Sequence, residues 1–211
     1  MCAGLIARVL AGIAVLAASL GAAPAQAHTA TTWSVSPGGA ATATATVGTV
    51  TLTDTSTGAV GTCASSKATG TVKKGSGLSG QDIGSVSAAA FGSCTALGSV
   101  PLTVTSRGLP WRISFTSYNA TTEVVRGTVS GVKVALTGSC DAVVNGSSSP
   151  AADGVVSAVY NDRIGQLTFL SSGSNLHYWH VRHCDRLIND GDPVALTASY
   201  AVRPIEDITS P

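Results

Sequence analysis

Residues 40–54 read AATATATVGTVTLTD, a stretch in which small or branched apolar side chains alternate with threonines. A period of two residues puts the apolar side chains on one face of an extended chain and the hydroxyls on the other. This is the pattern of a β-strand with one packed face and one wet face. The stretch therefore predicts two strands, at 40–47 and 48–54.

The same alternation returns along the rest of the chain, at 100–106, 112–117, 123–137, 155–160, 166–170, 176–182 and 194–202. Segments rich in turn residues lie between the strands, at 54–58, 75–80, 108–110, 145–150, 161–162, 171–175 and 189–192. Many short strands about ten residues apart favour an all-β fold, an antiparallel β-sandwich or a Greek-key barrel.

The composition excludes two classes of protein. Of the 211 residues 44% are hydrophobic, 11% charged and 5% aromatic, with 12 basic and 11 acidic side chains. A disordered chain of such low charge would also be poor in apolar residues, and a nucleic-acid binder needs a surplus of basic residues. Because the strands are rich in Ala and Thr, a few large side chains must fill the centre. We expect these to be Trp111, Phe115, Phe169, Leu170, Trp179 and Tyr200.

The N-terminus has the pattern of a secretory signal peptide over residues 1–27. One basic residue, Arg8, precedes an apolar run at 9–20 that is too short to span a membrane, and Ala25-Gln26-Ala27 suits signal peptidase. The expected mature chain, residues 28–211, is a single β-sandwich domain without a transmembrane segment. It is expected to be secreted, or associated with the cell surface, and to bind no nucleic acid.

Four cysteines remain after that cleavage, at positions 63, 94, 140 and 184. An even number in an exported protein predicts two disulfides, for which three pairings are possible. The short motifs around the first two cysteines faintly resemble those around the last two, which favours Cys63 with Cys94 and Cys140 with Cys184. No Cys-x-x-Cys motif is present, so redox or metal chemistry at these residues is not expected.

Three further patterns could hold a cofactor or a metal, and for each the structural interpretation is favoured. Gly75–Gly80 matches the Gly-x-Gly-x-x-Gly string, but no helix pattern follows it, so we interpret it as a turn. His177, His180 and His183 lie on a predicted strand, where the first and last are roughly 20 Å apart. The polar residues Asp185, Asn189, Asp190 and Asp192 lack the spacing of a calcium loop and predict a turn. No cofactor and no metal are expected.

Catalytic motifs of the common hydrolase families are absent from the sequence. We therefore expect a non-catalytic protein of the cell surface or extracellular matrix that self-associates or binds apolar or carbohydrate ligands. Cell-wall or matrix polymers, or a second copy of the chain, are the expected partners. Aromatic side chains exposed for ligand binding are predicted at Trp33, Tyr118, Tyr160 and Tyr178. The alternatives are an envelope β-barrel or pore and a secreted hydrolase.

Several short motifs resemble those of small secreted actinobacterial β-rich proteins of unknown function. They are Gly108-Leu109-Pro110-Trp111, the run 116–122, Asn175-Leu176-His177, and Cys184 with 187–189 and 191–192. The layout from Cys63 to Trp111 is also similar to the secreted activator-of-alkane-oxidation family, which is tied to the cell surface and matrix. These resemblances imply a surface role rather than catalysis.

Overall fold

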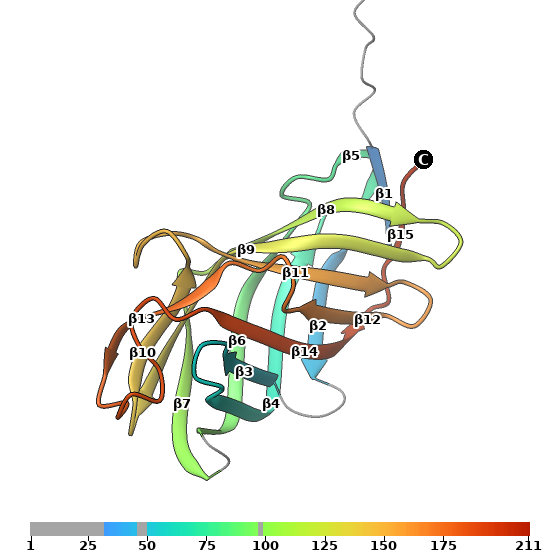
Figure 1. Ribbon diagram of the computed structural model, residues 1–211. Coiled ribbons are helices and arrows are strands. Elements are labelled where there is room, and N and C mark those ends of the chain that lie inside the picture. The colour runs from blue at the N-terminus through green and yellow to red at the C-terminus, as the bar shows by residue number, and fades with distance from the viewer. Residues whose placement is uncertain (1–31, 46–49, 97–98) are drawn as a thin grey trace, which may run out of the picture.

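The computed structural model describes residues 32–45, 50–96 and 99–211, and every regular element in these ranges is a β-strand (Figure 1). The predicted signal peptide lies outside the described residues. The strands are β1 Thr32–Ser36, β2 Gly39–Ala45, β3 Val50–Asp54, β4 Val60–Val72, β5 Gly75–Ser79, β6 Gly84–Ala96, β7 Val100–Arg107, β8 Trp111–Asn119, β9 Val124–Gly138, β10 Asp141–Gly146, β11 Gly154–Asn161, β12 Gln166–Leu170, β13 Leu176–Arg182, β14 Val194–Arg203 and β15 Asp207–Thr209.

Eight antiparallel strands close into a barrel, in the order β2-β4-β6-β8-β9-β11-β12-β14 and back to β2. The all-β prediction is confirmed, in its barrel form. Four strands, β4, β6, β9 and β14, continue beyond this ring. At that end β3 pairs with β4 and β14, β7 pairs with β6 and β9, and β10 pairs with β9 and β13. A bridge between His177 and Pro193 brings β13 beside the start of β14.

The remaining strands, β1, β5 and β15, form a separate three-stranded sheet, which we call the cap sheet. It lies at the top of Figure 1 and carries its own apolar cluster, formed by Trp33, Val35, Ile83, Val125, Tyr160 and Ile208. Side chains of β8, β9 and β11 contribute to this cluster, so the cap sheet is packed against one end of the barrel.

The alternating pattern predicted several strands well, but it missed the two that pair most extensively. β4 and β6 are hydrogen-bonded from Gly61–Ala96 to Val72–Gly84. Their inward positions hold small residues such as Ser66, Ala68 and Ala89, and their outward ones Ser, Thr, Ala and Lys. The contrast in hydropathy is therefore too weak to show a period. Residues 75–79, predicted as part of a turn, form β5 because they pair with β1.

Four of the six predicted core side chains pack inside. Trp111 and Tyr200 are buried, Phe169 packs on Tyr200 with ring centroids 5.5 Å apart, and Phe115 packs on Trp33 at 5.1 Å. The prediction was wrong for Leu170 and Trp179, which are half-buried and belong to neither apolar cluster. Inward residues of β12 and β13 alternate with them, at Phe169 and Tyr178, so the pleat turns the two side chains away from the centre.

The predicted disulfide pairing is confirmed. Cys63 is bonded to Cys94 across β4 and β6, and Cys140 to Cys184, with sequence separations of 31 and 44 residues. The first bond lies in the barrel core. The second joins the turn between β9 and β10 to the segment after β13.

Candidate functional site

The barrel contains a cavity of about 140 Å³, which we call the lumen. Its described lining comes from all eight strands of the closed ring and from β3, β7, β10 and β13. None of these lining residues is charged. An uncharged apolar group can therefore be buried in the lumen against apolar side chains without the desolvation cost that a polar or charged group would have.

The lumen exists because one part of its wall is made of small side chains. Ala41 and Ala43 on β2, Ala68 on β4 and Ala89 on β6 line the cavity together with large residues such as Trp111 and Phe169. Larger residues at these alanine positions would fill the space as an ordinary close-packed core does.

The polar side chains deepest in the lumen satisfy each other. The hydroxyl of Tyr200 is 3.1 Å from the Oγ of Ser66, and both residues are buried. Burial raises the pKa of Tyr200, which keeps the phenol neutral. The pair therefore offers a neutral hydroxyl contact and no charge.

A second cavity of about 170 Å³, the outer hollow, lies at the end of the barrel away from the cap sheet. Its inner wall is buried and includes Leu52, Leu136 and Tyr178. Its outer wall is exposed and includes Ser139, His183, Asp185 and Leu187. The hollow thus runs from the barrel core to solvent, with the Cys140–Cys184 disulfide in its side.

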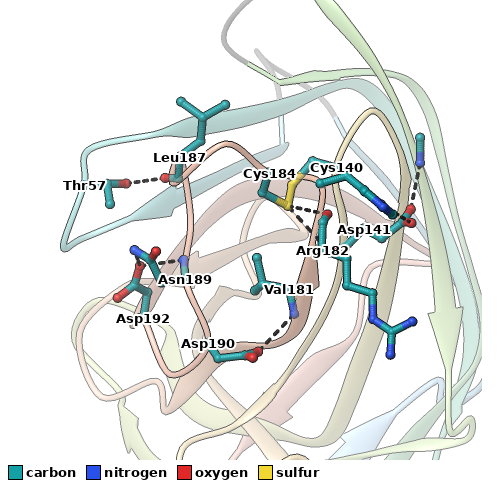
Figure 2. Close-up of a disulfide and its surroundings, with 12 residues drawn as sticks. Thr57, Cys140, Asp141, Val181, Arg182, Cys184, Leu187, Asn189, Asp190 and Asp192 are labelled. Atoms are coloured by element: carbon teal, nitrogen blue, oxygen red, sulfur yellow. Dashed lines mark hydrogen bonds and ion pairs between the residues drawn. A yellow bond between two sulfur atoms is a disulfide. The ribbon is translucent and has the colours of Figure 1, made fainter.

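The loop that follows this disulfide is held by three sets of hydrogen bonds (Figure 2). Thr57 donates its hydroxyl to the carbonyl of Leu187 at 2.6 Å, and Asp190 accepts from the amide of Val181 at 3.0 Å. Asp192 accepts from both the backbone and side-chain nitrogens of Asn189, each at 2.8 Å. These acids act as turn residues, as predicted, and hold the loop whose Leu187 and Ile188 line the outer hollow.

A histidine and an aspartate also lie close together at the rim. His183 Nδ1 lies 3.6 Å from Asp141 Oδ2, and both side chains are exposed, by 76% and 41%. Ser139 lines the same hollow, but no hydrogen bond joins it to His183 in the described chain. The three groups lie near one another without the hydrogen-bonded order of a catalytic triad.

The aromatic residues predicted as exposed ligand contacts lie elsewhere than expected. Trp33, Tyr160 and Tyr178 are only 2%, 6% and 3% exposed, so the prediction of exposure was wrong for all three. Trp33 and Tyr160 belong to the cap cluster, and Tyr178 lines the outer hollow. Tyr118 is half-buried against the cap cluster. The alanines of β2, β4 and β6 that line the lumen were not predicted from the sequence, where their only signal is their small size.

Tyr160 leads to a prediction about alkaline pH. Its hydroxyl accepts a hydrogen bond from the amide of Glu206 at 2.9 Å, and burial raises its pKa to about 12 from 10.0. The unfolded chain therefore ionises this tyrosine first, so stability is full below pH 10 and falls as the pH rises towards 12. We expect a loss of about 2 kcal/mol from this residue alone.

Urea unfolding at a series of alkaline pH values tests this. Tyr160→Phe should flatten the decline, although burial also raises the pKa of Tyr178 and Tyr200 and leaves part of the slope. An equally steep decline in the variant would contradict the assignment.

The histidines and acids do not assemble into a metal site within the described ranges. His177 Nδ1 lies 3.2 Å from the carbonyl of Asn175, and His180 is exposed with φ of 55°. Residues 32–45, 50–96 and 99–211 also contain no helix able to span a membrane.

No family model matches the chain, and neither curated proteins nor solved structures show detectable similarity to it. The resemblance to small secreted actinobacterial proteins and to the alkane-oxidation activators stays a prediction.

Proposed function

We propose that the protein is an exported, non-catalytic binding protein that holds a small uncharged apolar ligand in the barrel lumen. The observation that carries this proposal is a cavity of about 140 Å³ whose described lining includes no charged residue. Engineered apolar cavities of about 150 Å³ bind molecules the size of benzene. The two disulfides and the predicted signal peptide support an extracellular setting, where disulfides persist.

Among the ligand classes considered, the structure favours apolar molecules over carbohydrates. Sugar-binding surfaces use exposed aromatic rings, whereas three of the four candidate rings are buried.

The distribution of residues also favours a lumen that binds a ligand over a pore that conducts. Apolar side chains of β2 and β14 point inwards, and threonine and serine point outwards, the reverse of a water-filled channel in lipid.

Filling the lumen should abolish ligand binding. Ala89 lines the lumen, and Ala90, the next residue of β6, is exposed on the outer face. We expect Ala89→Phe to weaken binding of the uncharged fluorophore N-phenylnaphthylamine by about tenfold or more, since the ring occupies the space that the ligand needs. Fluorescence titration of the purified protein measures the effect.

Ala90→Phe is the matched control, because it adds the same ring to the outside of the same strand. It should bind the fluorophore as the original protein does. Thermal melting of both variants separates loss of binding from loss of fold, since overpacking alone costs about 1–3 kcal/mol. A folded Ala89→Phe variant with unchanged affinity, or an original protein that binds no apolar probe, would overturn the proposal.

A hydrolase is the second candidate, favoured by the proximity of Ser139, His183 and Asp141 at the rim. Nitrophenyl ester hydrolysis by the original protein and by Ser139→Ala tests it directly. Turnover that is lost in Ser139→Ala would establish catalysis at the rim. Equal background rates in both proteins would exclude this serine as a nucleophile.

A further inference from the structure

The lumen and the outer hollow meet at a single described residue, Leu52 of β3, which lines both. Leu196, its partner in register on β14, lines the lumen, while Leu136 lines the outer hollow. All three side chains are buried. At Leu52 the two cavities are therefore separated by one aliphatic side chain.

The opposite end of the barrel is filled. Val72, Ile113, Leu167 and Val202 line the lumen and also pack against the cap cluster. Within that cluster Ile83 is fully buried. A ligand that approached from this end would have to displace the cap sheet, whereas the outer hollow already reaches solvent at Ser139 and Leu187.

The two cavities set the size of a ligand that could occupy both. Each is close to the 150 Å³ that accommodates a benzene molecule of six carbons. A chain that passes Leu52 and fills both therefore has roughly twelve carbons.

The chemistry of the rim sets the polar end of such a ligand. Asp185 lines the rim, and Asp141, Arg182 and Arg186 are chain neighbours of lining residues, so the formal charges of these four residues cancel. His183 faces Asp141 at 3.6 Å, and Ser139 adds a neutral hydroxyl (Figure 2 shows Asp141 and Arg182 beside the disulfide). A neutral hydroxyl or ester head group can form hydrogen bonds with the donors and acceptors at the rim. A charged head group would not be attracted by a net charge of opposite sign.

We propose that the outer hollow is the entrance to the lumen and the head-group site for a neutral single-chain amphiphile of about twelve carbons. The alkyl chain passes Leu52 and ends in the lumen, and the polar head stays at the rim. This inference rests on the proposed function, because it assumes that the lumen binds apolar groups.

A homologous series of linear alcohols tests the size and the route. Affinity for the disulfide-bonded protein should rise about fourfold per methylene, the equivalent of ~0.8 kcal/mol, and level off near twelve carbons. Displacement of N-phenylnaphthylamine measures each affinity. A series that levels off near six carbons would overturn the continuous site.

Gly61 offers a way to block the outer hollow with little disturbance. It lines the hollow, and a Cβ added there meets only the carbonyl oxygens of Leu52 and Thr95, both at 3.9 Å. In Gly61→Phe we expect the series to level off near six carbons and the association rate to fall about tenfold. Ala64→Phe, at an exposed position of the same strand that lines neither cavity, is the matched control.

The outcomes separate this inference from the proposed function. If Ala89→Phe abolishes binding but folded Gly61→Phe behaves like the original protein, the lumen binds and the entrance lies elsewhere. The rival route is then the wall of β4, where exposed Thr69 and Thr71 line the lumen. For the head group, lauryl alcohol should bind more tightly than laurate and lauryltrimethylammonium. Tighter binding of either ion would overturn the neutral head.

Discussion

Replacing all four core and rim cysteines with alanine is expected to leave the protein largely unfolded at room temperature. The two bonds close loops of 31 and 44 residues, each of which stabilises the fold by roughly 4 kcal/mol in the chain-entropy model. The sum is comparable with the whole stability of a typical domain, about 5–15 kcal/mol. Urea unfolding followed by circular dichroism measures the loss.

The paired variants serve as controls. Each double variant removes one disulfide, so its free energy of unfolding should fall by roughly half as much as in the fourfold variant. The two double variants are Cys63→Ala with Cys94→Ala and Cys140→Ala with Cys184→Ala. Both sulfurs of the first pair are buried in the apolar core, whereas in the second pair Cys184 is buried and Cys140 only partly so, and the loss for the first pair should therefore be the larger. Unfolding midpoints unchanged by reduction of the original protein would show that the fold does not depend on its disulfides.

Trp33→Ala should produce the largest loss for a single side chain, about 3–5 kcal/mol. The indole is 2% exposed, packs on Phe115 at 5.1 Å between ring centroids, and shares the cap cluster with Val35 and Ile208. Removal leaves a cavity between the cap sheet and the barrel. Thermal or urea unfolding measures the change in the free energy of unfolding.

Tyr118→Ala is the control for this substitution, because the ring packs against the same cluster but is only half-buried. It should cost clearly less than Trp33→Ala. Comparable losses in the two variants, or a Trp33→Ala variant that keeps its stability, would contradict the burial of Trp33 in the cap cluster.

The strands of strong alternation could be predicted from the sequence for a plain physical reason. In β2, β3 and β14 the inward residues are Ala, Val, Leu and Tyr and the outward ones mostly hydroxyl-bearing, so burial on one face leaves a period of two. In β4 and β6 most positions on both faces hold small residues, and pairing with neighbouring strands decides their conformation. The local sequence of β4 or β6 does not indicate which strands will pair with it.

The candidate site could not be predicted for a related reason. Ala41, Ala68 and Ala89 lie on three strands that become adjacent only when β2, β4 and β6 pair, and only the closed ring places them around one cavity with Trp111. An alanine in a strand is common and does not by itself indicate a cavity. Exposure of Trp33 was mispredicted because burial depends on the cap sheet, which pairs β1 with β5 and β15 from distant parts of the chain.

The sequence by itself determined the all-β class, through a two-residue period that acts within a single strand, and the number of disulfides, through an even count of cysteines. The tertiary structure decided the closure of the barrel and the two cavities that meet at Leu52. The first set depends on residues that are neighbours along the chain. The second depends on hydrogen bonds and packing between residues that are far apart in the chain. Such contacts depend on loop closure and on burial across the whole fold.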